Sequence, residues 1–354
     1  MLKIMKQNTI AATLNDKNGV CEILDEASLP IDLYLEEGTT INTYINNLEN
    51  FYAWCSDRLL SLDRTYAKVI LNACGLTQSL NTRTRAYAAL QYHALTLTDF
   101  YWVQDEKDNF DWELINLYEH SWNNAVAISL TGKPLTVQNA MLIAPDCSTA
   151  GVSPKAWIRD NGHLYLLKGD TNGSVLKEIE ASQILTALGL QCVSYDKFWF
   201  ANQATARCEI FTNKHTALVT AEQYGFNNDL QQLLQTPECC YAYHLMNLSD
   251  YLIGNIDRHC GNWGFLLSDT GSIHPAPLMD FNRAFEAIDD TMCLPEILLK
   301  SDKTQLQAAR EAVDYLYMHQ PEMLKCLQEE MQNFDHIRFC YGRYTEQRIK
   351  TLLS

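Results

Sequence analysis

Three polar residues in the segment between Gly254 and Phe285 have types and spacing that suit a metal-assisted reaction. Asp257 and Asn262 lie five residues apart in a loop punctuated by glycines, and Asp280 follows eighteen residues later, after an apolar run and a turn. Carboxylate and amide oxygens suit Mg²⁺ that is coordinated jointly with substrate phosphates. Asp257 would then be free to accept or orient a hydroxyl proton, as phosphoryl transfer requires.

A lysine and two glutamates upstream could complete such a site. Lys168 ends the apolar run Leu164–Leu167, and the helix predicted after it carries Glu178 and Glu180 near its start. A cation at this place can pair with nucleotide phosphates, and it needs an acidic partner to hold it. Because the helix register is open, both glutamates remain candidates. A solvated strand end remains the plainer alternative for Lys168 taken alone.

The segment from Cys147 to Lys155 is rich in small residues. Its hydroxyl and backbone N–H groups could cover phosphates, although such a loop alone is only a turn. Placed before the lysine, the glutamates and the three polar residues of the first segment, it completes the order of parts found in kinase-like sites. The candidate phosphate-binding residues of this loop are Ser148, Thr149, Gly151, Ser153 and Lys155.

A hairpin and a helix are predicted to position these side chains. Lys155–Arg159 and His163–Leu167 have the pattern of strands, and Asn161-Gly162 between them favours a two-residue turn, because both turn positions need positive φ. Ser174 is the expected N-cap of the following helix, and Gly189 is its expected end. Further strands are expected at Ala140–Ile143, Val193–Phe200, Ala206–Phe211 and Trp263–Leu267.

The 354 residues divide by pattern into three regions. Residues 1–135 are expected to be mostly helical, residues 136–221 to form a small sheet with one embedded helix, and residues 222–354 to form a helical lobe that carries the polar loop. This order predicts an α+β fold. The helices expected in the first region are Asn47–Leu60, Arg64–Leu76 and Thr84–Leu97.

The composition is that of an acidic globular protein. Lys and Arg number 27 against 43 Asp and Glu, a formal net charge of -16, which disfavours direct nucleic-acid binding and an anionic membrane surface. No signal-peptide pattern occurs within Met1–Pro30, and no apolar run approaches the roughly 20 residues that span a bilayer. The twelve cysteines are scattered without a CxxC pair, so we expect reduced thiols in a cytoplasmic protein.

Six motifs surround the candidate residues: STAGVSPKAW, LYLLKGD, EIEASQILTALGL, CEIFTN, DYLIGNIDRHCGNWGF and PLMDFNRAF. They resemble those of the bacterial HipA-like serine/threonine kinases, several of which are toxins of toxin–antitoxin modules. The resemblance covers about Ala144–Phe285 and, more loosely, the C-terminal helices. It implies a protein-kinase-like fold, in which a small β-sheet lobe with one helix meets a larger helical lobe, and it implies ATP and Mg²⁺ as cofactors.

The resemblance implies a role for each residue of the first segment. Asp257 is similar to the catalytic aspartate of the family, and Asn262 and Asp280 are similar to its magnesium ligands. His259 belongs to the same DRH string and is counted with the nucleotide-binding residues. Asp280 is followed by Phe-Asn rather than Phe-Gly, so we do not assume that this motif flips between two conformations.

The resemblance also implies roles for the residues upstream. Lys168 is similar to the lysine that holds the nucleotide phosphates, and Glu178 falls where the family has its helix glutamate, with Glu180 as a rival. Glu209 and Phe211, in an ExF pattern after a strand, are similar to the hinge that meets adenine.

The leading hypothesis is a kinase that transfers the γ-phosphate of ATP to a Ser or Thr hydroxyl of a protein substrate. Ser148 falls where an autophosphorylated serine occurs in the family, so the chain itself is one expected substrate. A small-molecule or phosphoinositide-type kinase on the same scaffold, and a nucleotide-binding pseudokinase or interaction module, stay open as alternatives. A toxin role with an antitoxin partner also stays open. About the first 135 residues do not match the N-terminal subdomain of the best-known HipA toxins, so an antitoxin contact through that subdomain does not follow from the resemblance.

Overall fold

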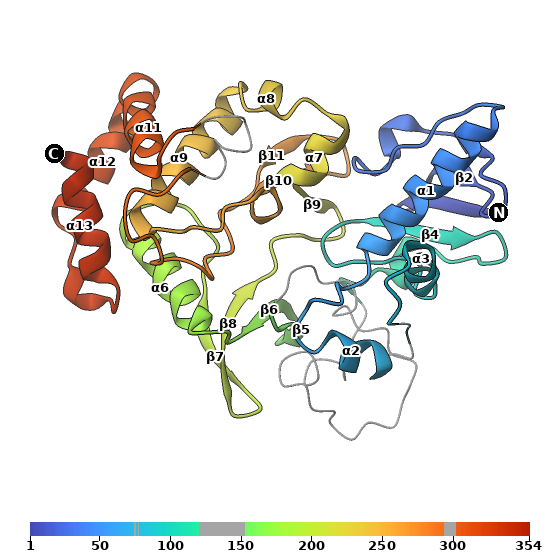
Figure 1. Cartoon of the computed structure of the whole chain (residues 1–354), viewed down its shortest axis with the longest axis horizontal. Helices are drawn as coiled ribbons and strands as arrows, with labels where there is room; N and C mark the ends of the chain where they lie inside the picture. Colours follow the sequence, from blue (N-terminus) through green and yellow to red (C-terminus); the bar gives the residue numbers. More distant parts are fainter. Residues whose placement is uncertain (74–75, 77, 120–152, 294–301) are drawn as a thin grey trace.

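The computed structural model describes residues 1–73, 76, 78–119, 153–293 and 302–354 of the chain. Within these residues, helices flank three antiparallel sheets (Figure 1). This mixture of helices and antiparallel strands agrees with the predicted α+β class. The strand expected at Ala140–Ile143 lies outside the described residues.

The N-terminal region contains a four-stranded sheet that the sequence pattern did not predict. Its strands, in the order β3-β2-β1-β4, are β1 (Leu2–Lys6), β2 (Thr9–Leu14), β3 (Cys21–Ile23) and β4 (Tyr101–Asp105). β4 pairs with β1 from the far end of the region, with Leu2 opposite Asp105. The region that was expected to be mostly helical therefore also holds a sheet.

The three helices expected in this region are present with shifted bounds. They are α1 (Ile41–Asp57), α2 (Ala67–Ala73) and α3 (Thr82–Leu90), and the short α4 (Trp112–Ile115) follows β4. Thr40 is the N-cap of α1 and Asn81 is the N-cap of α3. In each, a side-chain oxygen accepts a hydrogen bond from the backbone N–H three residues later.

The predicted hairpin forms the second sheet. Its strands, in the order β5-β6-β8-β7, are β5 (Lys155–Asp160), β6 (His163–Gly169), β8 (Gln203–Glu209) and β7 (Asp196–Phe200). Asn161 and Gly162 have φ of 49° and 88°, which confirms the predicted turn. Gly189, with φ of 73°, ends α6 (Ser174–Ala187) as predicted.

The predicted N-cap of α6 is wrong by one residue, because Gly173 rather than Ser174 occupies this position. The carboxylate of Asp170 supplies the capping acceptors, since it receives hydrogen bonds from the backbone N–H groups of Gly173 and Val175. Ser174 is the first helical residue, and its hydroxyl accepts from the N–H of Thr171. These bonds fix the turn between β6 and α6.

The third sheet contains the strand expected at Trp263–Leu267. Its order is β11-β10-β9, with β9 (Thr216–Thr220), β10 (Gly264–Ser268) and β11 (Ile273–Pro275). The helices described after β9 are α7 (Ala221–Asn227), α8 (Leu230–Leu233), α9 (Pro237–Ile253), the 3-10 helix η3 (Cys260–Asn262), α11 (Gln305–His319), α12 (Pro321–Gln332), the 3-10 helix η4 (His336–Arg338) and α13 (Gly342–Leu353). Among the described helices, none has the length and apolar character needed to span a bilayer.

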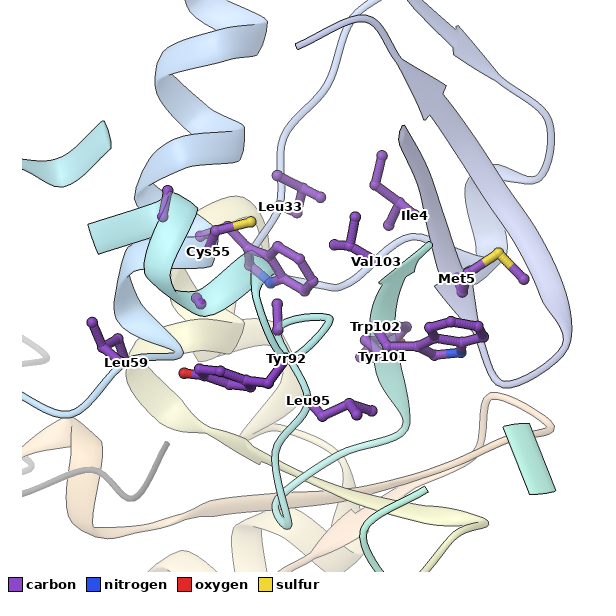
Figure 2. Packing of buried hydrophobic residues seen from close by; sticks show 14 of the residues in the cluster. Ile4, Met5, Leu33, Cys55, Leu59, Tyr92, Leu95, Tyr101, Trp102 and Val103 are labelled. Carbon is purple, nitrogen blue, oxygen red and sulfur yellow. The ribbon is translucent and has the colours of Figure 1, made fainter. Parts of the chain in front are cut away.

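The N-terminal region packs directly against the rest of the chain. In Figure 1 it lies beside β9 and α7, at the opposite end from α12 and α13. Its buried core, with Ile4 of β1 and Val103 of β4 in Figure 2, belongs to the same apolar cluster as Leu164 of β6. The N–H of Leu218 on β9 also donates to the carbonyl oxygen of Thr98, over 2.7 Å. The hydrophobic core of the N-terminal region therefore extends to residues of the second and third sheets.

Candidate active site

Lys168 lies at the centre of a buried ionic cluster. Its Nζ is 2.5 Å from Oε1 of Glu178 on α6 and 2.9 Å from Oδ1 of Asp280. The lysine and Glu178 are 6% and 1% exposed, which excludes the solvated strand end as a description of Lys168. The second strand of the hairpin, the helix α6 and the segment that contains Asp280 thus bring together three side chains that lie up to 112 residues apart in the chain.

Glu178, not Glu180, contacts the lysine. Two positions along an α-helix correspond to a rotation of about 200°, so only one of the two glutamates can face a given side chain. Glu180 is also buried, at 8% exposed, and its Oε2 has no hydrogen-bond partner among the described residues. The helix register, which the sequence left open, is therefore decided by the packing of α6.

The charges of this cluster stabilise one another. Burial pulls the pKa of Lys168 down, but the carboxylates of Asp280 and Glu178 hold it well above its usual value. Burial acts against ionisation of Asp280 as well, yet Lys168 and Lys155 keep the pKa of that carboxyl below its usual range. Burial raises the pKa of Glu178 in spite of its bond to Lys168. A lysine cation and an Asp280 anion result.

Asp280 has an uncommon backbone conformation. Its φ is 61°, in the left-handed region that non-glycine residues rarely adopt, at a typical cost of about 1–3 kcal/mol. The next residue, Phe281, donates its backbone N–H to Oε2 of Glu178 over 3.0 Å and packs edge-on against Tyr195. Glu178 therefore holds both Lys168 and the backbone that carries Asp280.

Asp257 and Asn262 lie on one tightly bonded loop around η3. The carbonyl oxygen of Asp257 accepts hydrogen bonds from Nδ2 of Asn262, at 2.8 Å, and from the N–H of His259, at 2.9 Å. The Nδ1 atom of His259 accepts from the N–H of Gly261. With its nitrogen turned to Asp257, the amide of Asn262 keeps its oxygen, Oδ1, for another partner such as a cation.

The carboxyl group of Asp257 has a pKa that suits a proton acceptor. Burial raises this pKa, the charges of His259 and Arg283 oppose the rise, and the charge of Asp280 adds to it. A carboxyl group shifted in this direction binds a proton more readily near neutral pH than an exposed aspartate does.

Arg258 is a residue of this site that sequence reasoning missed. It is 1% exposed, and its Nε and Nη2 atoms each lie 2.9 Å from one carboxylate oxygen of Asp250 on α9. Its place in the DRH string, directly after Asp257, was the available signal. The pairing with Asp250, within α9, depends on the fold of the loop and was not readable from the chain.

The residues predicted to meet adenine lie at the end of β8. Glu209 is exposed, and its Oε1 lies 2.7 Å from Nδ1 of His163, so its side chain contacts the neighbouring strand. Phe211 is half-buried and packs on the apolar cluster of the helical lobe, together with Leu166 and Leu278. Glu209 and Phe211 thus lie at the end of the strand that pairs with β6, the strand that carries Lys168.

The predicted phosphate loop is described only in part. Ser148, Thr149 and Gly151 lie outside the described residues. Ser153 lies just before β5, and Lys155 begins that strand directly opposite Lys168. Burial lowers the pKa of Lys155, with Asp280 opposing and Lys168 adding to the shift. A second lysine therefore lies within electrostatic reach of Asp280.

Comparisons with known proteins show which chains this protein is similar to. No family model matches the chain. The serine/threonine-protein kinase CtkA of Helicobacter pylori is 27% identical over 165 residues, covering 38% of this chain and 50% of that protein. The chain therefore spans about half the length of the curated relative that it matches.

The solved structure of HipA from the Shewanella oneidensis toxin–antitoxin system, in complex with HipB and its operator DNA, has a similar fold. The TM-score is 0.54 at 12% identity, over 99% of this chain and 96% of that chain, so the likeness includes the N-terminal region. The likeness to HipA shows the fold, and this fold agrees with the one that the motifs imply. Together with the CtkA match, it supports the resemblance of the motifs to those of the HipA-like kinases.

Proposed function

We propose that this protein is an ATP- and Mg²⁺-dependent serine/threonine protein kinase. The observation that carries the proposal is the contact of Lys168 with both Glu178 and Asp280, next to the loop that holds Asp257 and Asn262. In kinases, a lysine–glutamate pair and a metal-binding aspartate must both be in place for phosphoryl transfer. The sequence relationship to a serine/threonine kinase supports the same activity.

The donor atoms present fit a magnesium ion shared with phosphates. The oxygen Oδ1 of Asn262 and the carboxylate of Asp280 would hold it, and the bound ion would neutralise charge on the transferring phosphoryl group. Among the described residues, no cluster of three or more His, Cys, Asp or Glu could hold a metal ion without further ligands. Mg²⁺ commonly binds in this way, through one or two protein ligands and substrate phosphates.

Each side chain of the site has one task in this proposal. Lys168 holds the nucleotide phosphates. Glu178 fixes the position of the lysine through their ion pair, while Asp280 forms a second ion pair with the same lysine. Asp257 accepts the proton of the Ser or Thr hydroxyl as the oxygen attacks the γ-phosphorus, and the bond to the β-phosphate oxygen breaks. Lys155 and Ser153 are further phosphate-binding candidates at the start of β5.

A role as the toxin of a toxin–antitoxin pair is the narrower form of this proposal. It is supported by the likeness to HipA across 99% of the chain, including the N-terminal region. The same neighbour is bound to HipB and operator DNA, so the expectation of no nucleic-acid contact, drawn from the charge of -16, has no support from this comparison. Autophosphorylation at Ser148 remains a prediction.

The experiment that tests the proposal uses labelled ATP. Purified protein is incubated with γ-labelled ATP and Mg²⁺, in the presence of casein in one arm and of phosphatidylinositol vesicles in another. Label on protein that is lost in Asp257→Asn and kept in Asp269→Asn supports the proposal, since Asp269 is a half-buried turn residue paired with His215. Label on lipid supports the phosphoinositide-type alternative, and nucleotide binding without any label supports a pseudokinase.

A further inference from the structure

The guanidinium of Arg258 connects two segments that the helical lobe brings together. While Nε and Nη2 bind Asp250, the remaining nitrogen, Nη1, donates to the carbonyl oxygen of Asn262 at 2.6 Å and to that of Met279 at 2.5 Å. The same group lies 5.6 Å from the ring centre of Phe281. One buried side chain thus binds α9, the loop around η3 and the segment after β11.

The two carbonyl groups belong to a candidate magnesium ligand and to the neighbour of another. One is the carbonyl of Asn262 itself, and the other belongs to the residue immediately before Asp280. On the other side of Asp280, the N–H of Phe281 is held by Glu178. Buried charged side chains therefore hold the peptide groups on both sides of a residue whose φ, 61°, an unconstrained aspartate rarely adopts.

We propose that Arg258 is a positioning residue that sets the separation of Asn262 and Asp280, so that their oxygens can share one Mg²⁺ with the nucleotide. The inference rests on the proposed function. Arginine suits this task because its planar group offers five donors in a fixed geometry, enough for a carboxylate and two carbonyls at once. The arginine acts through the metal ligands and contacts neither the nucleotide nor the acceptor hydroxyl.

The chain provides a matched control for this inference. Arg58, in the N-terminal region, is also buried, binds the two carboxylate oxygens of Asp99 at 2.8 and 2.9 Å, and donates to the carbonyl oxygens of Ala94 and Tyr101. It also lies over an aromatic ring, that of Trp54, at 4.4 Å. A change to Lys at either position removes the same kind of network, but only one network adjoins the metal ligands.

The experiment measures ADP binding by calorimetry, without metal in EDTA and along a titration with Mg²⁺, for wild type, Arg258→Lys and Arg58→Lys. We expect Arg258→Lys to need about ten- to a hundredfold more Mg²⁺ for the same affinity, as changes in the groups that orient metal ligands commonly do. The ADP affinity of Arg258→Lys without metal should stay within about twofold of the wild-type value. The Mg²⁺ titration of Arg58→Lys should match that of wild type. Asp250→Asn, which loosens the same arginine, should shift the Mg²⁺ requirement in the same direction.

The outcomes separate this inference from the function on which it rests. A wild-type protein whose ADP binding does not respond to Mg²⁺ contradicts the proposed function. If wild type responds, an unchanged Mg²⁺ requirement in folded Arg258→Lys overturns the positioning role, as does an equal loss of metal-free binding. If Arg258→Lys does not fold, as judged by circular dichroism, Asp250→Asn decides, and a wild-type Mg²⁺ requirement in that variant overturns the inference.

Discussion

The N-terminal region and the helical lobe each contain a buried arginine that binds an aspartate through two nitrogens and also donates to two backbone carbonyls. All protein partners of Arg58 in this network lie between residues 94 and 101, so the arginine joins the end of α1 to the chain leading into β4. Arg258 instead joins three segments, two of which carry candidate magnesium ligands. The same chemistry therefore joins structural segments in one region and holds the candidate metal ligands in the other.

Burial alone does not distinguish the two arginines. Both guanidiniums lose water and regain hydrogen bonds, and in both the charge of the aspartate keeps the pKa of the arginine above its usual value in spite of burial. The difference lies in the residues whose carbonyls are held. Around Arg58 these residues lie in an apolar core, as Tyr101 does in Figure 2, whereas around Arg258 they adjoin ionisable side chains.

The greatest loss of activity is predicted for an aspartate of the candidate site, compared with an aspartate of the N-terminal region. Asp280→Asn should lower phosphoryl transfer by on the order of 10³-fold or more, because it removes both the carboxylate charge proposed to hold the metal ion and an ion-pair partner of Lys168. Asp99→Asn should leave turnover per folded molecule near wild type. Steady-state kinetics, normalised to the folded fraction measured by circular dichroism, checks both. Equal losses of turnover would remove the distinction between the regions.

A second effect distinguishes two glutamates on one helix. Glu178→Gln should reduce turnover by about 10²-fold, because the neutral amide holds Lys168 and the backbone of Phe281 less firmly. Glu180→Gln, two positions away on α6, should remain within about threefold of wild type. Measurement of kcat and KM for ATP in both variants checks this. The reverse ranking would assign the lysine partner to Glu180.

A third effect should appear in stability rather than in catalysis. Arg58→Met leaves the carboxylate of Asp99 buried without its partner, so the free energy of unfolding should fall by about 3–5 kcal/mol. Urea unfolding followed by tryptophan fluorescence measures the loss. At a temperature where the variant is folded, its kcat should match that of wild type, and a selective loss of kcat would show that the N-terminal region contributes to the reaction.

The smallest effect concerns the pH dependence of the reaction. Because Asp257 works as a base only when ionised, kcat/KM should fall as the pH drops through its pKa, which burial raises above 3.8. Arg283→Gln removes a positive charge that favours the carboxylate, so the midpoint of this fall should move to higher pH, by less than about one unit.

A half-buried aspartate of the N-terminal region, Asp32, supplies the control for this profile. Burial also raises the pKa of Asp32, which binds Trp54 and Gln223. Protonation of Asp32 should not change kcat/KM, so Asp32→Asn should keep the wild-type midpoint of the pH–rate profile. The pH–rate profiles of the three proteins check this, and a midpoint that moves with Asp32 instead of Arg283 would contradict the assignment of the base.

Much of the site could be predicted because its signals are local. The Asn161-Gly162 turn, the end of α6 at Gly189 and the strand that leads to Lys168 all follow from backbone preferences of a few residues. The N-cap was misplaced by one residue, because Asp170 competes with Ser174 for the same role over a distance of a single turn. Local sequence signals thus predict where an element lies more reliably than they predict the residue at which it begins or ends.

The N-terminal sheet was not predicted because its decisive pairing is not local. β1 and β4 pair across about a hundred residues, and the aromatic run that becomes β4 is as compatible with core packing of helices as with a strand. Only the closure of the sheet over α1, with Trp102 and Ile4 fully buried, selects the extended form.

The order of residue types shows which side chains are available for chemistry: a lysine at a strand end, an aspartate and an asparagine on one glycine-rich loop, and a second aspartate before an aromatic residue. The tertiary structure decided which of them meet. It paired Lys168 with Glu178 rather than Glu180, and it made Arg258 the link between Asn262 and Asp280. The physical reason is that residue type and local turn preference act over a few positions, whereas pairing of buried charges depends on how whole elements pack.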